Sequence, residues 1–289
     1  MQLIDRFKQD IGMGEFKKET YNMYKSTVSI FLNHIDKAEE DISLKDVQDF
    51  IRYLRYEKKL SIGTINNYRS GIKYLFEVTL DKGWNDRKVP RIRGYNPLPS
   101  VLDRNEVKNL INAVPHVMYK TVLSTIYSSG LRVREAVTLK CRDIDSKRMQ
   151  IYVSEGKNSN ARYTILSEKN LILLRDYVKL WKKRTGYSFA VDDYLFPSPY
   201  KRDRGKHIST RSIQKSITKA AKEANINKNA TVHTLRHCFA THLLESGESL
   251  LNIKHLLGHN SIRSTCIYLH LVDVTKMGIK SPFDMEVPN

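Results

Sequence analysis

The chain of 289 residues is long enough for one or two domains, and its 49 lysines and arginines against 31 aspartates and glutamates leave a formal charge of +18. A balance this basic is typical of a protein with a polyanionic partner, most often nucleic acid, although a generally cationic surface gives the same number. Three cysteines without a metal-ligand spacing, the lack of a signal-peptide core and the lack of an apolar run of roughly 18 residues argue against a zinc site, secretion and a membrane span. We therefore expect a soluble cytoplasmic protein.

Apolar residues recur with helical spacing through the first ninety residues. One stripe covers 21–35 and a second covers 47–54. A third covers 65–76 and follows Ser61 or Thr64 as a candidate N-cap. These stripes predict helices that face a common core, with basic residues on their polar faces.

A change of composition marks a domain boundary. Residues 86–100 hold three prolines, one glycine and four basic residues, a composition that interrupts helices and indicates a linker. We expect an N-terminal helical domain over 1–88, a basic linker over 89–100 and a second domain over 101–289. Residues 1–98 hold 18 basic and 14 acidic residues, whereas the remainder holds 31 and 17, so the second domain carries most of the excess charge.

The second domain is predicted to be helical around one small sheet. Strand-like runs on both sides of the polar tip GKNSN predict a β-hairpin over 149–167. Apolar periodicity predicts helices at 104–114, 117–129, 169–184, 210–225, 234–246, 249–257 and 261–271. The expected fold class is mainly α with a small β-sheet (α+β).

Two polar segments of this domain are candidates for chemistry. In SSGLRVRE, Gly130 ends one helix and Arg132 lies where the chain turns, with Glu135 three residues on to orient its guanidinium. The hairpin tip EGKNSN carries Lys157. Taken singly, a surface helix cap and an exposed hairpin lysine are equally good interpretations.

Two further segments lie near the C-terminus. In HTLRH, His233 and Arg236 share one face of a helix, an arrangement suited to a phosphate because arginine binds its oxygens in bidentate fashion. The neighbouring His237 and His242 are interpreted as ordinary polar residues of that helix. In LGHNS, a glycine releases His259 into a turn, and a tyrosine follows nine positions later.

The four segments together resemble the tyrosine recombinase (phage integrase) family. SSGLRVREAVTLK, EGKNSNAR, HTLRHCFATHLLESG and IKHLLGHNSIRSTCIYLH match it in order and spacing, most closely its compact Xer-like and transposon-borne members. The resemblance is dense over 101–272 and looser over the N-terminal helices, which resemble the family's core-binding domain. Arginine and cysteine stand at 134 and 238, where relatives often carry serine. The chain lacks the insertion typical of integron integrases.

The resemblance assigns catalytic roles in this sequence. It implies two catalytic arginines, a hairpin lysine, two histidines and a nucleophilic tyrosine, with Glu135 as a supporting acidic neighbour. These catalytic residues are Arg132, Lys157, His233, Arg236, His259 and Tyr268.

The implied reaction breaks a DNA phosphodiester and stores it as a 3′-phosphotyrosine, with a free 5′-hydroxyl as the other product. Two arginines clamp the nonbridging oxygens, so no metal, ATP or other cofactor is expected. Lys157 is the candidate acid for the leaving oxygen. His233 is the candidate base and His259 the hydrogen-bond donor to the phosphate, and these two roles can be exchanged.

Strand exchange through a Holliday junction joins two duplexes, so the implied assembly is a homotetramer on a double-stranded recombination site, formed from monomers, with a partner recombinase or accessory protein as an option. The tail after Tyr268 carries Val272, Val274, Met277 and Ile279, which pack either on their own domain or on a neighbouring subunit. The implied location is the bacterial cytoplasm, near the nucleoid. Candidate DNA contacts are Arg69, Lys73, Arg91, Arg93, Lys206 and Arg211.

Several alternatives remain open at this stage. A type IB topoisomerase and a telomere resolvase share the bond chemistry but fit the chain length and motif spacing less well. A DNA-binding architectural or regulatory protein would bind a site without forming a covalent adduct. A generic basic helical protein leaves the ordered set of motifs unexplained. The sequence identifies neither the target site nor the choice between integration, excision and dimer resolution.

Overall fold

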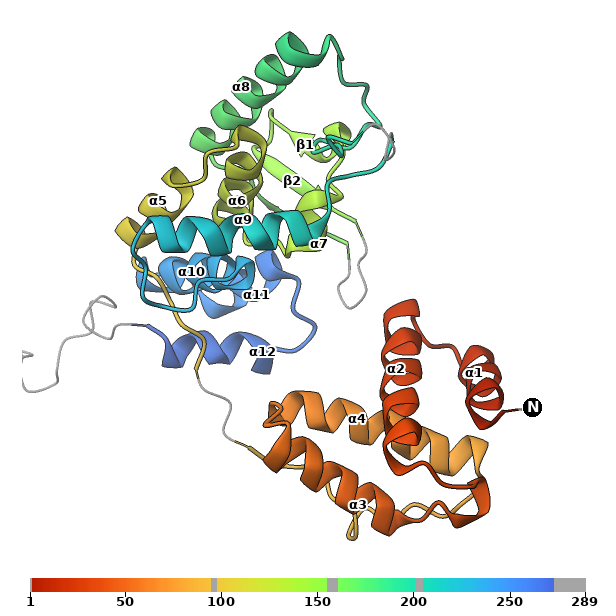
Figure 1. Cartoon of the computed structure of the whole chain (residues 1–289). Coiled ribbons are helices and arrows are strands. Elements are labelled where there is room, and N and C mark those ends of the chain that lie inside the picture. Colours follow the sequence, from red (N-terminus) through yellow and green to blue (C-terminus); the bar gives the residue numbers. More distant parts are fainter. Residues whose placement is uncertain (1, 95–97, 155–160, 201–204, 273–289) are drawn as a thin grey trace, which may run out of the picture. The chain divides into compact units, whose positions relative to one another are not determined.

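A computed structural model describes residues 2–94, 98–154, 161–200 and 205–272 (Figure 1). The chain divides into two compact units, Met1–Asn96 and Pro97–Asn289. The expected class is confirmed, because helices dominate both units and the described strands form a single small sheet in the second.

The N-terminal unit is a helical bundle around an aromatic core. The predicted stripes form α2, α3 and α4, and Phe31 and Phe50 meet edge to face with their ring centroids 5.3 Å apart. Ser61 is the N-cap of α4 and accepts a hydrogen bond from the backbone N–H of Thr64. The elements are α1 (Leu3–Met13), α2 (Lys18–Ile35), η1 (Glu39–Asp41), α3 (Leu44–Arg52), η2 (Tyr53–Glu57), α4 (Ile62–Tyr74) and η3 (Leu75–Thr79).

The segment that follows these helices folds back onto α4. Val89 is buried in the core of the unit, and Asn66 pairs with both the N–H and the carbonyl of Ile92, each at 3.0 Å. Arg69 donates from Nε to the carbonyl of Val89 at 2.8 Å and forms an ion pair with Asp86. Arg69, a candidate DNA contact expected on the polar face of its helix, is therefore buried instead, because this returning segment covers it.

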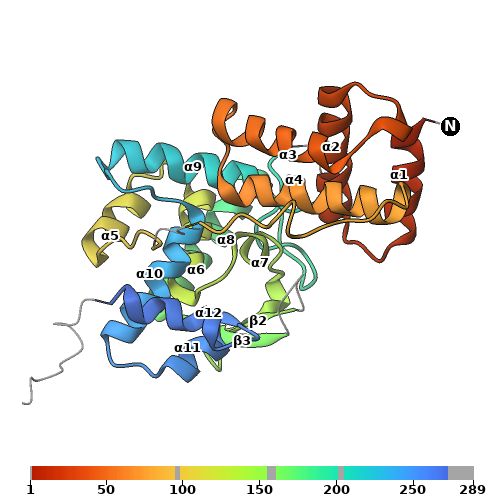
Figure 2. The ribbon, with the colours of Figure 1, turned by 90° about the horizontal axis from the view of Figure 1, so that it is seen from below.

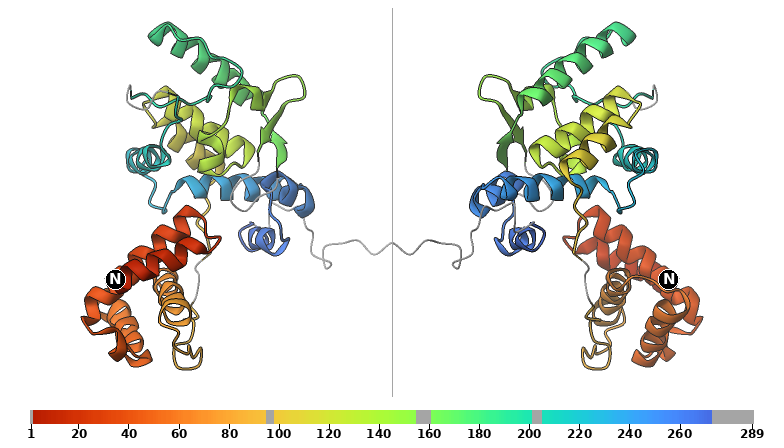
Figure 3. Two further views of the ribbon diagram at one scale, coloured as in Figure 1. Left: turned by 90° about the vertical axis from the view of Figure 1, so that its right-hand side faces the viewer. Right: turned by 90° about the vertical axis from the view of Figure 1, so that its left-hand side faces the viewer.

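The sheet of the second unit lies at one edge of a group of helices, and α8 lies at the end far from α10, α11 and α12 (Figures 1 and 3). The antiparallel strands run in the order β1-β2-β3, with Tyr152 opposite Tyr163. The elements are α5 (Arg104–Asn112), α6 (Val117–Ser129), α7 (Val133–Val137), η4 (Cys141–Asp143), β1 (Ile144–Asp145), β2 (Gln150–Val153), β3 (Arg162–Ile165), α8 (Glu168–Thr185), α9 (Thr210–Glu223), α10 (Val232–Glu245), α11 (Leu250–Leu257), α12 (Arg263–Cys266) and η6 (Ile267–His270).

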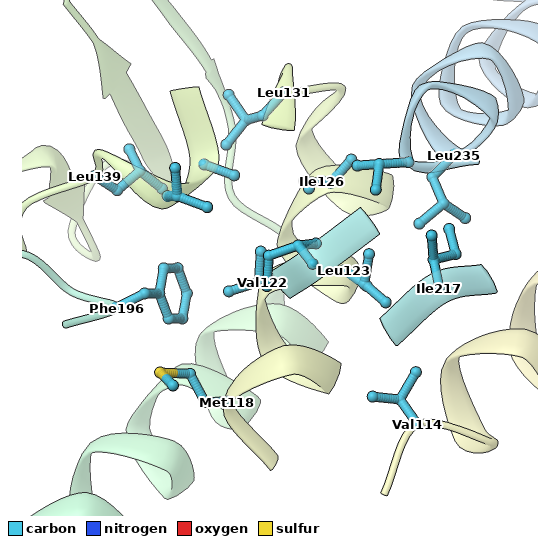
Figure 4. Close-up of a cluster of buried hydrophobic side chains, with 14 of the residues drawn as sticks. Val114, Met118, Val122, Leu123, Ile126, Leu131, Leu139, Phe196, Ile217 and Leu235 are labelled. Carbon is cyan, nitrogen blue, oxygen red and sulfur yellow. The ribbon is translucent and has the colours of Figure 1, made fainter. Parts of the chain in front are cut away.

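Helix α6 is the centre of this unit. It contacts α5, α7, α8, α9 and α10. Val122, Leu123 and Ile126 are fully buried in the cluster of Figure 4, between Leu139 on one side and Leu235 on the other. Burial of such side chains contributes roughly 1.5–3 kcal/mol each, so α6 fixes the relative positions of the segments on both sides of it.

The predicted helices and hairpin are confirmed with shifts of a few residues at their ends. The last one differs more, because the region predicted as one helix over 261–271 consists of the short α12 and the 3-10 turn η6. Helix α1 and strand β1 were not predicted. Among the described residues, no helix combines the length and apolar character needed to cross a membrane.

Candidate active site

The first predicted segment forms the sharp turn between α6 and α7. Gly130 ends α6 with φ of +66°, a left-handed conformation that costs glycine little. Arg132 is then the N-cap of α7, where its backbone N–H donates to Glu135 Oε2 at 2.8 Å and its Nη1 donates to Oε1 at 2.8 Å. The pairing expected from the i, i+3 spacing is present and holds the Arg132 side chain at one third exposure.

A second arginine binds the same carboxylate. Arg162, the first residue of β3, donates to both oxygens of Glu135, at 3.1 Å from Nη1 and 2.8 Å from Nη2. Its Nε donates to the carbonyl of Leu256 near the end of α11, at 2.8 Å. Arg162 thus connects the hairpin strand, α7 and α11. No local sequence pattern indicates this role, because its partners lie 27 and 94 positions away.

Arg236 is the largest fully buried side chain of the unit. Only 1% of the residue is exposed, and its guanidinium donates to the carbonyls of Gly130 at 2.6 Å and Leu257 at 2.7 Å. Its Nη1 also lies 3.7 Å from Glu135 Oε2. The two predicted arginines therefore converge on one carboxylate, and together with Arg162 they leave a net positive charge at this point.

Three histidines lie around this charge cluster. His233 and His237 are one turn apart on α10, with their rings 4.5 Å apart and nearly perpendicular. His259 follows Gly258, which ends α11 with φ of +64°, and its Nδ1 lies 2.9 Å from Thr265 Oγ1. A Cβ atom at position 258 would lie 2.7 Å from Cδ of Arg162. The turn that positions His259 therefore needs glycine both for its left-handed backbone and to avoid this clash.

Tyr268 lies in η6 and is 2% exposed. It packs in a cluster with Phe239 and Leu257. Its ring is parallel to that of His259, at 8° and 6.3 Å between centroids. Its hydroxyl lies 3.3 Å from Nδ1 of His237. His237, interpreted from the sequence as an ordinary polar residue, is therefore a member of the site.

Burial and the arginines set the charge state of these groups. Burial alone would raise the pKa of the Glu135 carboxyl, but the hydrogen bonds and charge of Arg162, with those of Arg132, lower it to about 2. Burial and then neighbouring positive charges lower the pKa of His237 and of His259 to about 4. At neutral pH the carboxylate is therefore ionised and these two imidazoles are neutral.

The same causes act on the other members. Loss of solvent, followed by the charges of Arg236 and Arg132, lowers the pKa of His233. Burial raises the pKa of Tyr268, while those two arginines act against the rise. Burial, and then Arg132, lowers the pKa of Arg236 to about 10, so it stays protonated at neutral pH. Positive charge near a phenol favours its ionised form, which is the better nucleophile.

The structure thus brings together all the predicted catalytic residues that it describes. The remaining one, Lys157, is in the segment between β2 and β3 and lies outside the described residues. The elements that carry the others are adjacent in space: α10, α11 and α12 are neighbours in Figure 2, and β3 contacts α11. His242, the other histidine interpreted as an ordinary helix residue, pairs with Tyr127 Oη at 2.9 Å.

A basic surface adjoins the site. Arg132 and His233 line a pocket of about 580 Å³ that also includes Gln214 and Thr218 of α9. The latter two residues also border a shallow depression of about 470 Å³. That depression is lined by the cationic side chains of Arg211, Lys215, Lys219 and Lys222. The positive charge of the site therefore continues along α9.

The remaining candidate DNA contacts lie elsewhere. Arg91 and Arg93 are exposed on either side of Ile92, and Lys206 is exposed before α9. Lys73 is half-buried and pairs with Asp86 at 3.1 Å. Because Arg69 is also buried against Asp86, the exposed candidates are Arg91, Arg93, Lys206 and Arg211.

Comparisons with known proteins find similar sequences along nearly the whole chain. Residues 100–274 match the phage integrase family, and residues 3–86 match the phage integrase N-terminal SAM-like domain. The protein y4qK of Sinorhizobium fredii, whose name places it among integrases and recombinases, is 34% identical over 98% of this chain and 89% of its own length. A tyrosine recombinase of Thermosipho africanus is 30% identical over 90% of this chain and 91% of its own length.

Among solved structures, a lambda integrase dimer bound to a COC′ core site has the same fold. It superposes with a TM-score of 0.72 at 19% identity, over 92% of this chain and 75% of that one. At this identity the likeness concerns the fold alone.

Proposed function

The chain belongs to the phage integrase family of tyrosine recombinases, and from this we propose that it is a site-specific DNA recombinase that cuts and rejoins strands through a bond from Tyr268 to a DNA phosphate. The observation that carries the proposal is the meeting of a buried tyrosine with Arg132, Arg236 and two neutral histidines in one charged site.

Arg132 and Arg236 are the groups that bind the phosphate. Arginine presents paired donors to phosphate oxygens, and the transition state carries its extra charge on those oxygens. Glu135 neutralises one of the three arginine charges and orients Arg132, which leaves positive charge for the incoming anion. With these two guanidinium groups the reaction needs neither a metal ion nor ATP.

The protons move as follows. The tyrosine oxygen forms a bond to phosphorus while the bond to the 5′-oxygen breaks, giving a 3′-phosphotyrosine. The phenolic proton passes to a base, His233 or His259, and Lys157 supplies the proton that the 5′-oxygen takes up. The 5′-hydroxyl of a second strand then reverses the step, so that one phosphodiester replaces another through a Holliday junction.

The partner is a double-stranded recombination site held by four subunits. The lambda integrase of the comparison is a dimer on a core site, which supports a DNA-bound oligomer here. We assign residues 1–88 to core binding, in keeping with the match to a SAM-like domain, with 89–100 as the linker and 101–289 as the catalytic domain. The basic face of α9, including Arg211, is the candidate contact with the phosphate backbone.

The biological outcome is integration or excision of a mobile element, or resolution of chromosome dimers, alone or with a partner recombinase in the cytoplasm at the nucleoid. The family membership supports both roles. The DNA that flanks the gene distinguishes them, because a mobile element carries its recombination sites at its own ends.

The test is a trapping assay with nicked duplexes made from that flanking DNA. A nick beside the cleavage point lets the short product diffuse away, so a covalent adduct accumulates and is seen on a denaturing gel. We expect an adduct in EDTA with the wild-type chain and with Tyr163→Phe, whose tyrosine is 57% exposed, and none with Tyr268→Phe. Specific binding without an adduct at any flanking site would instead favour an architectural DNA-binding protein.

A further inference from the structure

The hydroxyl of Tyr268 is hydrogen-bonded to a histidine to which the family resemblance assigned no role. Oη of Tyr268 lies 3.3 Å from Nδ1 of His237, and the two ring centroids are 5.6 Å apart. The ring of His259 lies parallel to the tyrosine ring, and its Nδ1 is hydrogen-bonded to Thr265 Oγ1. Of the three histidines around the nucleophile, His237 is the one whose hydrogen bond to the reacting oxygen the structure defines.

Neighbouring groups hold His237 in place. It follows the buried Arg236 directly on α10, and its ring stands against that of His233 at 78°. Arg236 is fixed by two backbone carbonyls, so the turn of α10 that carries His237 is anchored at the centre of the site. A side chain on such a rigid element can define the position of an atom better than one on a loop.

The charge state of His237 suits an acceptor. Burial, and then the nearby His233 and Arg236, lower its pKa to about 4, so the imidazole is neutral at physiological pH. A neutral imidazole with its proton on Nε2 accepts a hydrogen bond at Nδ1.

We propose that His237 is a positioning residue for the nucleophile, an inference that rests on the proposed function. Tyr268 donates its hydroxyl hydrogen to Nδ1 of His237, which fixes the rotation of the O–H bond. The lone pairs of the oxygen then face away from His237 and are available to phosphorus. His237 holds the oxygen in place until the DNA phosphate binds. The O–H bond then turns from His237 toward His233 or His259, which accepts the proton as the oxygen bonds to phosphorus.

Two substitutions of His237 distinguish a hydrogen-bond acceptor from a side chain that only packs against its neighbours. His237→Leu removes the acceptor, whereas His237→Asn keeps a carbonyl oxygen at about the position of Nδ1. The measurement is the single-turnover rate of adduct formation on the nicked duplex at saturating protein, together with the dissociation constant for that duplex. We expect His237→Leu to be roughly 10-fold slower, since one hydrogen bond of about 1.4 kcal/mol corresponds to that factor.

We expect His237→Asn to recover most of the wild-type rate, with the dissociation constant unchanged in both variants. The matched control is His242→Leu, which removes a histidine on the same helix, 7% exposed and bonded to Tyr127 instead of the nucleophile. It should lower the melting temperature without slowing adduct formation by the folded protein.

The outcomes are distinguishable. Equal rates for the wild-type chain and His237→Leu, or equal slowing by the leucine and asparagine variants, would overturn the positioning role and leave the proposed function standing. Absence of an adduct from the wild-type chain at every flanking site would overturn the proposed function and this inference with it.

Discussion

Arg162 and Glu135 form a bidentate ion pair in the interior of the second unit, with side-chain exposures of 7% and 8%. The carboxylate also binds Arg132, and the guanidinium also binds the carbonyl of Leu256. Strand β3 is thereby joined to the turn that carries Arg132, the first arginine of the proposed catalytic set. We therefore expect displacement of either partner to affect both stability and the proposed phosphate site.

Replacement of Arg162 by methionine should destabilise the second unit by about 3–5 kcal/mol, because it leaves Glu135 buried with less compensation. The matched control is Arg142→Met, which breaks an ion pair with Asp192 whose side chains are 54% and 69% exposed, and it should cost less than about 1 kcal/mol. Urea denaturation measures both. The chain has two tryptophans, so in a Trp84→Phe background fluorescence reports on Trp181 in the second unit. Similar losses for the two variants would contradict the buried pair.

The pH dependence of stability should identify Glu135 as an acid-sensitive group. Its pKa of about 2 in the folded protein lies below its usual 4.5. Its stabilising contribution is therefore complete above pH 4.5 and is lost as the pH falls toward 2. Glu135→Gln should be less stable than the wild-type chain at pH 6, and the difference should shrink by about 2 kcal/mol by pH 3. Free energies of unfolding from urea titrations at pH 6, 5, 4 and 3 give this difference, and a constant gap would argue against an ionised, ion-paired Glu135.

Features that depend on local sequence were predictable. The helices follow from local apolar spacing, and His233 and Arg236 were paired because residues three positions apart on a helix share a face. Arg162 and His237 were missed for a different reason. The partner of His237 lies 31 positions away on η6, and no local pattern distinguishes this histidine from its neighbour His242.

The burial of Arg69 also depends on tertiary contacts. As a charged residue in the α4 pattern it was expected on the polar face of the helix, but residues 84–92 fold back onto that face and cover it. The role of Lys157 stays a prediction. The turn at Gly258 was expected from its sequence, but the contact with Arg162 that forbids a side chain there depends on the packing of β3 against α11.

Replacement of Gly258 by alanine should disturb the site more than the strain of a left-handed alanine alone would. Gly186 ends α8 with φ of +70° and has open space around its missing side chain, so Gly186→Ala pays only the conformational cost of about 1 kcal/mol. Gly258→Ala adds a clash with Arg162 and displaces His259. We expect a larger loss of stability and at least a 10-fold slower adduct formation for Gly258→Ala alone. Equal behaviour of the two variants would show that the Arg162 contact is unimportant.

The two arginines Arg69 and Arg211 should respond in opposite ways when each is replaced by alanine. Arg211 is exposed on α9, so its loss should weaken DNA binding and reduce the slope of log affinity against log salt concentration by about 0.9. Arg69 binds Val89 and Asp86 and lies over the ring of Trp84, so its loss should leave that slope unchanged. Its effect should appear instead as about 2 kcal/mol of destabilisation of the N-terminal unit, since hydrogen bonds to charged groups are lost.

The two slopes are measured by fluorescence anisotropy of a labelled duplex from the flanking DNA. The titrations are repeated at about ten salt concentrations between roughly 50 and 300 mM. Urea denaturation in a Trp181→Phe background gives the stability of the N-terminal unit through Trp84, whose ring contacts Arg69. A reduced salt slope for Arg69→Ala would mean that this guanidinium leaves Asp86 to bind a phosphate. An unchanged slope for Arg211→Ala would remove α9 from the DNA-binding surface, because an exposed cation that contacts a phosphate must release a counterion when the complex forms.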